Sequence, residues 1–232
     1  MPEGNFFHYD QAAVDHLARK DKKLAAAMQA IGPVRREVMP DLFQALMHAI
    51  TGQQISMAAQ RTVWGRLCGL LGEVTPQALL AQPQTALQAL GLSARKVDYM
   101  RGIARQVVDG ELDLPGMTAL EDAEVCRRLA ALRGIGVWTA EMLLLFSLQR
   151  PDILSYDDLA IRRGLRMLYR HKEMPRERFE RYRRRFSPYG SLASLYLWAI
   201  AGGALPELDD PAERKKGRSR PAASLKSTAT KD

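Results

Sequence analysis

A glycine-rich turn between two helical segments constrains this chain more than any other stretch. Residues 132–140 read Leu-Arg-Gly-Ile-Gly-Val-Trp-Thr-Ala. Two glycines separated by one apolar residue form a tight turn, and without β-carbons they let backbone N–H groups approach a bulky anion. A helix predicted over 138–149 begins directly after the turn, so its unpaired N–H groups and positive dipole end add to an anion site. The pattern predicts a helix-hairpin-helix over 129–149.

The expected anion is a nucleic-acid phosphate, because the chain is basic. It carries 34 Lys and Arg against 26 Asp and Glu, a formal net charge of +8. Within 159–186 there are eleven Lys and Arg against three glutamates, which favours a phosphate-facing surface over a merely solvated helix face. We predict that the N–H groups of Gly134, Gly136 and Trp138 hold the phosphate.

Helical patterns run almost from end to end, and no segment shows the alternation typical of a strand. About ten helices are expected, and the one at 138–149 is apolar nearly all round, as a central buried helix is. No linker appears before residue 207. We therefore predict one all-α body over 1–206 and a disordered tail over 207–232, which is basic and lacks apolar periodicity.

Composition excludes several classes of site and location. Cys68 and Cys126 are the only cysteines, and two isolated thiols supply neither a four-thiolate iron–sulfur cluster nor a structural zinc site. No apolar run approaches the roughly 18 residues of a membrane span, and the first residues lack the features of a secretion signal. The sequence predicts a cytoplasmic protein with no membrane association.

An acidic pair, Asp157-Asp158, follows the hairpin within the stretch Tyr-Asp-Asp-Leu-Ala-Ile. The hairpin and this pair together resemble the helix-hairpin-helix, Gly/Pro-rich loop, aspartate (HhH-GPD) superfamily of DNA glycosylases. Within it, the chain is most similar to bacterial 3-methyladenine DNA glycosylases of type II. Two further stretches match, Ala-Ile-Thr-Gly-Gln-Gln-Ile-Ser at 49–56 and Phe-Ser-Pro-Tyr-Gly-Ser at 186–191.

The resemblance covers roughly residues 40–205 and carries expectations about architecture and partner. It implies a two-lobed helical body with the active-site cleft between the lobes. Larger relatives add an N-terminal β-rich domain, for which the residues before Pro40 are too few. The expected partner is double-stranded DNA containing alkylated bases, bound by a monomer in the nucleoid of a bacterial cytoplasm.

The resemblance assigns catalysis to Asp158, because the family's catalytic aspartate immediately precedes the helix that begins Leu-x-Ile. Cleavage of an N-glycosidic bond develops positive charge on the deoxyribose, which a fixed carboxylate can stabilise while orienting water. A cationic alkylated base is already a good leaving group and needs no second acid. The alternative role for Asp157 and Asp158 is helix capping, where aspartate is favoured.

Position 138 indicates the subclass. Bifunctional relatives place there a lysine that attacks the sugar and cuts the strand through a Schiff base, whereas Trp138 has no nucleophile. The chain should therefore release the base and leave an abasic site. The resemblance places Trp138, Met142 and Tyr189 in the base pocket, where an indole face can stack on a cationic purine. Tyr189 stands where the resembled enzymes have tryptophan, and Gly190 where they have arginine.

Two further assignments come from the resemblance. Extrusion of a nucleotide leaves a hole in the base stack, and Gln54 matches the residue that fills it as a wedge; its alternative role is that of a polar loop residue. Hairpins of this family often hold a monovalent cation, Na⁺ or K⁺, on backbone carbonyls, here those of Leu132 and Gly134. No other cofactor is expected.

Three other functions remain open on sequence grounds. One is a glycosylase for oxidised, deaminated or mismatched bases, and another is a non-catalytic helix-hairpin-helix DNA-binding protein. A basic scaffold for RNA or protein is the third, although no aromatic platform motif supports it. The range of lesions is also open: it includes 3-methyladenine, 7-methylguanine, 1-methyladenine, ethenoadenine and hypoxanthine.

Overall fold

The computed structural model describes residues 5–213. Over that range the chain is all-α, as predicted, and its only β pairing is an isolated bridge between Phe6 and Glu37. The helices are α1 (Gln11–Lys20), α2 (Lys22–Ile31), α3 (Leu42–Gly52), α4 (Met57–Leu71), α5 (Pro76–Ala81), α6 (Gln84–Ala89), α7 (Ala94–Val108), the 3-10 helix η1 (Pro115–Ala119), α8 (Asp122–Ala130), α9 (Val137–Phe146), α10 (Leu159–Tyr169), α11 (Arg176–Phe186) and α12 (Gly190–Ala201).

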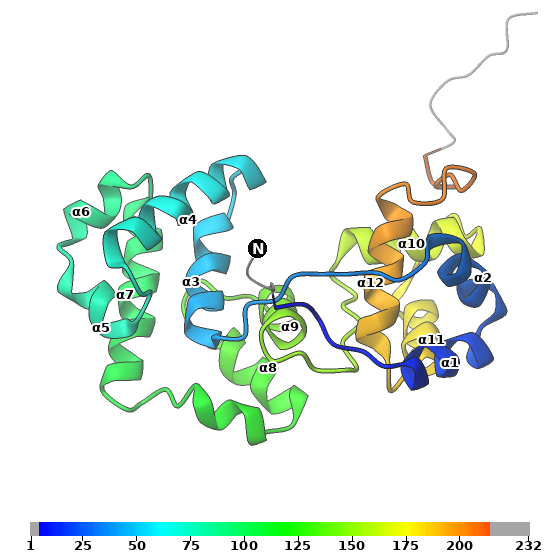
Figure 1. Cartoon of the computed structure of the whole chain (residues 1–232), viewed down its shortest axis with the longest axis horizontal. Helices are drawn as coiled ribbons and strands as arrows, with labels where there is room; N and C mark the ends of the chain where they lie inside the picture. The colour runs from blue at the N-terminus through cyan, green and yellow to red at the C-terminus, as the bar shows by residue number, and fades with distance from the viewer. Residues whose placement is uncertain (1–4, 214–232) are drawn as a thin grey trace, which may run out of the picture.

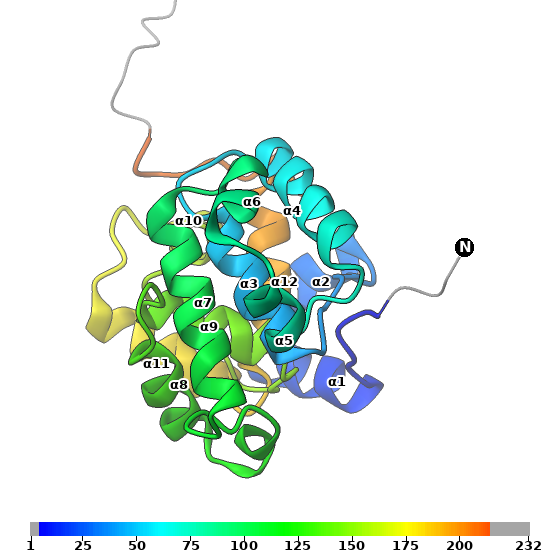
Figure 2. The same cartoon turned by 90° about the vertical axis from the view of Figure 1, so that its left-hand side faces the viewer.

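The helices form two lobes on either side of α8 and α9 (Figure 1). One lobe holds α3 to α7, and the other holds α1, α2, α10, α11 and α12. Figure 2 looks onto the first lobe, with the helices of the second lobe behind it. Two extended segments connect these parts: residues 32–41 cross from α2 in the second lobe to α3 in the first, and residues 147–158 cross from the central α9 to α10 in the second lobe.

The central helix is α9, and it packs on α8 to form the predicted hairpin. Its side chains at Ala140, Leu143, Leu144 and Leu145 are buried. The helix ends at Phe146 rather than at residue 149, because the backbone of Gln149 turns left-handed (φ 51°) and Pro151 follows. The expected hairpin is thus present, with a shorter second helix.

The N-terminal residues contribute two helices that sequence periodicity did not single out. Asp10 caps α1 by accepting a hydrogen bond from the Ala13 N–H group, and Asp21 caps α2 in the same way. Leu17 and Leu24 are fully buried. These helices pack against α12 and so belong to the second lobe.

The predicted boundary of a disordered tail at residue 207 is wrong. Residues 207–213 lie on the body, and Asp210 is buried. Its carboxylate accepts a hydrogen bond from Arg166 Nε at 3.0 Å and lies 3.7 Å from Arg163 Nε. These ion pairs to α10 order the segment, although its composition resembles that of a linker. The remainder of the predicted tail, 214–232, lies outside the described residues.

Within residues 5–213, no helix combines the length and the apolar character that crossing a membrane requires.

Candidate active site

The carboxylate of Asp158 is held by three hydrogen-bond donors. Oδ1 accepts from the Ile161 N–H group at 2.8 Å and from Trp198 Nε1 at 3.1 Å. Oδ2 accepts from Trp138 Nε1 at 3.0 Å. Asp158 is only 7% exposed and caps α10, whereas Asp157 is exposed. Of the pair, Asp158 therefore takes the capping role, and its side chain is the buried one.

This carboxylate faces a cavity of 820 Å³ between the two lobes. The first lobe contributes Met57, which is 83% exposed at the start of α4. Aromatic and aliphatic side chains make up most of the wall, and two arginines of the crossing segment line it as well. The lining residues are Val34, Arg35, Arg36, Met57, Trp138, Met142, Phe146, Asp158, Leu195, Trp198 and Ala199. The volume is in the range typical of ligand pockets.

Trp198 on α12 is the main site residue that the sequence reasoning missed. Its ring stacks on Phe146 (centroids 5.4 Å apart, 26° between planes) while its N–H group donates to Asp158. The available signal was its rarity, since the chain has three tryptophans and this one lies in an otherwise apolar helix.

The structure brings Trp138 and Met142 to the same cavity as Asp158. Trp138 is 46% exposed, because it lies in the first turn of α9 where the hairpin opens to solvent. Met142 follows one helical turn later on the same face. Because the indole N–H group of Trp138 is directed at the carboxylate, one ring both orients Asp158 and lines the cavity.

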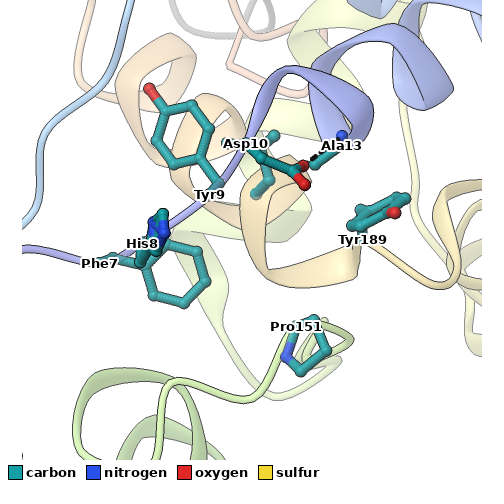
Figure 3. A pocket seen from close by; sticks show the side chains of 8 residues that line it. Phe7, His8, Tyr9, Asp10, Ala13, Pro151 and Tyr189 are labelled. Atoms are coloured by element: carbon teal, nitrogen blue, oxygen red, sulfur yellow. Dashed lines mark hydrogen bonds between the residues drawn. The ribbon is translucent and has the colours of Figure 1, made fainter.

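Tyr189, which was predicted to line the base pocket, does not border the cavity that Asp158 faces. Tyr189 lines a separate cavity of 220 Å³ with N-terminal residues and Pro151 (Figure 3). Its ring packs edge-on against His16, with centroids 5.2 Å apart. Tyr189 precedes α12, whereas Trp198 lies nine residues further on, which is a rise of about 13 Å along a helix. The motif that suggested Tyr189 therefore lies at the opposite end of α12 from Asp158.

The two hairpin glycines meet different requirements. Gly134 has φ 91°, and a β-carbon there would overlap the ring of Tyr99. Gly136 has an ordinary φ of −93°, and a β-carbon there would meet nothing within 4 Å. Gly136 caps α9 without a side-chain hydrogen bond, so the first N–H groups of α9, that of Trp138 among them, are open to an external acceptor.

The hairpin is tied to the turn that carries Gln54. The amide Nε2 of Gln53 donates to the Gly134 carbonyl at 2.7 Å. Gln54 next to it is exposed and adopts a left-handed backbone (φ 57°). A second cavity of 700 Å³ lies between this turn and the hairpin, and it includes Gln54, Gly134, Gly136 and Trp138. The predicted wedge and phosphate residues therefore border one cavity, next to that of Asp158.

A half-buried carboxyl on α9 accepts a hydrogen bond from the segment that leads to Asp158. Glu141 on α9 accepts a hydrogen bond from the hydroxyl of Ser155. Burial raises the pKa of the Glu141 carboxyl above its usual value, an effect that this hydrogen bond opposes. The contact connects α9, which carries Trp138, to the crossing segment that ends at Asp158.

Much of the basic run at 159–186 is neutralised within the protein. Six of its eleven cations form ion pairs with carboxylates, namely Arg163, Arg166, Arg170, Arg176, Arg183 and Arg185. The net charge that this run presents to a partner is therefore smaller than its composition indicates.

The comparisons with known proteins agree with this geometry. Residues 47–188 match the family model of the HhH-GPD superfamily of base excision DNA repair proteins. The match spans more than half of the chain, and the chain belongs to this superfamily.

Within this superfamily, the chain is similar to several individual proteins. The structure of a DNA-3-methyladenine glycosidase from Bacillus halodurans is similar with a TM-score of 0.78 and 34% identity, covering 88% of this chain and 95% of that one. A 3-methyladenine DNA glycosylase from Schizosaccharomyces pombe, solved in complex with abasic DNA, has a TM-score of 0.71 and 30% identity, covering 81% and 95%. The DNA-3-methyladenine glycosylase 2 of Escherichia coli is 30% identical, over 70% of this chain and 58% of that protein.

Proposed function

We propose that this protein is a monofunctional DNA glycosylase for alkylated purines of the 3-methyladenine type. It extrudes the damaged nucleotide from duplex DNA, hydrolyses the N-glycosidic bond and leaves an abasic site. The observation that carries the proposal is the carboxylate of Asp158, held by two indole N–H groups at the wall of an aromatic cavity. Relatives named as DNA-3-methyladenine glycosylases support the choice of lesion class.

The chemistry assigned to Asp158 is electrostatic. As the glycosidic bond breaks, positive charge develops on the sugar, and a carboxylate that is already oriented stabilises it without reorganising. The indole and backbone donors fix the orientation of the carboxylate and restrict its rotation. The same carboxylate can orient the attacking water.

Two neighbouring side chains would handle the extruded nucleotide. Trp138 offers one face of its indole to the base, and a cationic purine on that face gains about 0.5–2 kcal/mol of cation–π attraction. Gln54, exposed on its left-handed turn, fills the gap in the stack. Trp138 in place of lysine leaves no amine at that position, so the strand should stay intact.

The hairpin would hold the backbone of the damaged strand. Its phosphate ligands are the N–H groups of Gly134, Gly136 and Trp138. The carbonyls of Leu132 and Gly134 fit a monovalent cation such as Na⁺ or K⁺ as neutral oxygen donors. Each accepts one hydrogen bond, from the Ile135 N–H group and from Gln53 Nε2, and keeps a second lone pair. Replacing K⁺ by a bulky organic cation at equal ionic strength should then weaken DNA binding.

The proposal is tested by incubating the protein, which we expect to act as a monomer in the cytoplasm, with damaged DNA. Methylated duplex DNA and duplexes bearing 1-methyladenine, ethenoadenine or hypoxanthine serve as substrates. We expect free base to be released, strand breaks to appear only after alkali, and borohydride to trap no protein–DNA adduct. Binding without base release from any substrate would favour a non-catalytic DNA-binding protein, and an adduct formed as fast as base release would overturn the monofunctional assignment.

A further inference from the structure

The cavity of 700 Å³ between the Gln54 turn and the hairpin has a second wall, formed by the start of α7. Its lining holds two cations, Arg95 and Lys96, and no carboxylate. The lining residues are Ala49, Gly52, Gln53, Gln54, Gln60, Ser93, Arg95, Lys96, Tyr99, Gly134, Gly136, Trp138, Thr139 and Met142. The positive charge of this wall attracts an anion. The hairpin on the opposite side of the cavity offers backbone N–H groups that can donate hydrogen bonds to the same anion.

Lys96 is held in a fixed place at this wall. Its Nζ donates to the Thr51 carbonyl at 2.9 Å, and burial lowers the pKa of its ammonium group. Arg95, beside it, is exposed. Within residues 5–213, neither cation forms an ion pair with a carboxylate. This distinguishes them from the cations of α10 and α11, most of which are neutralised within the protein.

The backbone adds to the positive electrostatic potential of this cavity. The N-terminal ends of α7 and α9 both border this cavity, through Ser93 and Arg95 on one side and Gly136 and Trp138 on the other. Both helices have at least ten residues, so each N-terminus presents unpaired N–H groups and a partial positive charge. Two helix ends and two side-chain cations therefore converge on one volume.

We propose that Arg95 and Lys96 form the second half of the phosphate site of the hairpin. One phosphodiester of the DNA backbone is held between the α9 end, through backbone N–H groups, and the α7 end, through the two cations. The inference rests on the proposed function in that DNA is the ligand. Because Gln54 borders the same cavity, the phosphate belongs to a nucleotide close to the extruded one.

The first experiment measures the affinity for undamaged and abasic duplexes at several salt concentrations. Each phosphate contact that is lost reduces the slope of log K against log salt by about 0.9. Lys96→Met and Arg95→Gln should each reduce the slope by about that amount and weaken binding at low salt about tenfold. Lys96→Arg, which keeps the charge, should restore both quantities.

The matched control is Arg105→Gln, at an exposed cation near the far end of the same helix. It removes the same charge about 14 Å further along α7, so its slope should stay close to that of the wild-type protein. If Lys96 only tethers α7 to α3, Lys96→Met will lower the melting temperature without changing the slope. That result, with an unchanged slope in the exposed Arg95→Gln variant, overturns the proposal.

A second experiment tests whether both halves hold the same phosphate. Neutral methylphosphonates are placed one at a time along the strand next to an abasic site. Wild-type affinity should fall at one position. There both Lys96→Met, which lacks the cation, and Gly136→Val, whose side chain blocks the approach of the phosphate to the α9 end, should lose less affinity than wild type, because part of the contact is already absent. If the two variants lost their sensitivity at different positions along the strand, the two halves would contact different phosphates, and the proposal would be wrong. The readout is binding alone, so it stands apart from base release: loss of the slope effect contradicts this inference, and absence of excision contradicts only the proposed function.

Discussion

The two ends of α12 present similar residues in different surroundings. Near its N-terminus, Tyr189 borders a cavity of 220 Å³, and Asp152 accepts hydrogen bonds from the Gly190 N–H group at 3.0 Å and the Ser187 hydroxyl at 2.6 Å. Towards its C-terminus, Trp198 borders a cavity of 820 Å³ and donates to Asp158. Each end thus pairs an aromatic residue with an aspartate from the segment that joins α9 to α10.

The difference lies in what the carboxylates bind. Asp152 accepts from a backbone N–H group and a loop hydroxyl, which fastens the start of α12 to the crossing segment. Asp158 accepts from two indoles that also line a cavity large enough for a base. An aspartate near an aromatic residue therefore does not define a functional site by itself. What distinguishes Asp158 is the large cavity next to its carboxylate.

The largest expected effect comes from neutralising one aspartate at a time. Asp158→Asn should reduce base release about a hundredfold or more, because a fixed charge is worth roughly 3 kcal/mol at the transition state. Affinity for DNA should remain. The measurement is the single-turnover rate at saturating DNA, together with a separate binding titration.

The control for this change is Asp152→Asn. It should leave the excision rate unchanged and lower the free energy of unfolding by about 1 kcal/mol, since hydrogen bonds that fasten α12 are weakened. A loss of excision in Asp152→Asn with normal activity in Asp158→Asn would reverse the roles assigned to the two ends of α12.

An intermediate effect is expected from the aromatic residues. Trp198→Phe keeps an aromatic ring on Phe146 but removes the N–H donor to Asp158. We expect the single-turnover rate to fall about tenfold, the equivalent of 1.4 kcal/mol for a hydrogen bond to a charged group, with unchanged affinity for abasic DNA.

Tyr189→Phe is the matched change at the other end of α12, where the ring borders the smaller cavity. It should leave both the excision rate and the affinity unaltered. Equal losses in Trp198→Phe and Tyr189→Phe would show that the N–H donor at Asp158 has no special role.

The smallest expected effect concerns the hydrogen bond between Glu141 and Ser155, which connects α9 to the segment that leads to Asp158. Burial raises the folded-state pKa of Glu141 above its usual value, so the folded protein binds this proton more tightly than the unfolded chain. The contribution of Glu141 to stability therefore decreases as the pH rises through that pKa. Glu141→Gln should remove this dependence, and its melting temperature relative to wild type should rise by a few degrees at most between pH 4 and pH 8.

The comparison for this prediction is the melting curve at pH 4, below the ordinary pKa of a glutamate, where wild type and Glu141→Gln should nearly coincide. A difference in melting temperature that is constant from pH 4 to pH 8 would mean that folding does not change the pKa of the Glu141 carboxyl.

The features that the sequence determined by itself are local ones. The all-α class, the hairpin and the position of Asp158 at the start of α10 follow from helical periodicity, from a glycine pair and from a capping residue. Each depends on interactions between residues a few positions apart. Family resemblance added the catalytic role that we propose for Asp158, because a carboxylate at this distance from a hairpin is specific.

The features that only the tertiary structure decided depend on contacts between residues far apart in the chain. Trp198 reaches Asp158 across 40 positions and Gln53 reaches Gly134 across 81. The misplacement of Tyr189 has the same origin: its motif does not specify which end of α12 borders the cavity of Asp158. Likewise, the acidic residue Asp210 orders a segment of linker-like composition only because α10 presents arginines to it. Periodicity specifies which face of a helix is buried, but only the packed structure specifies what that face meets.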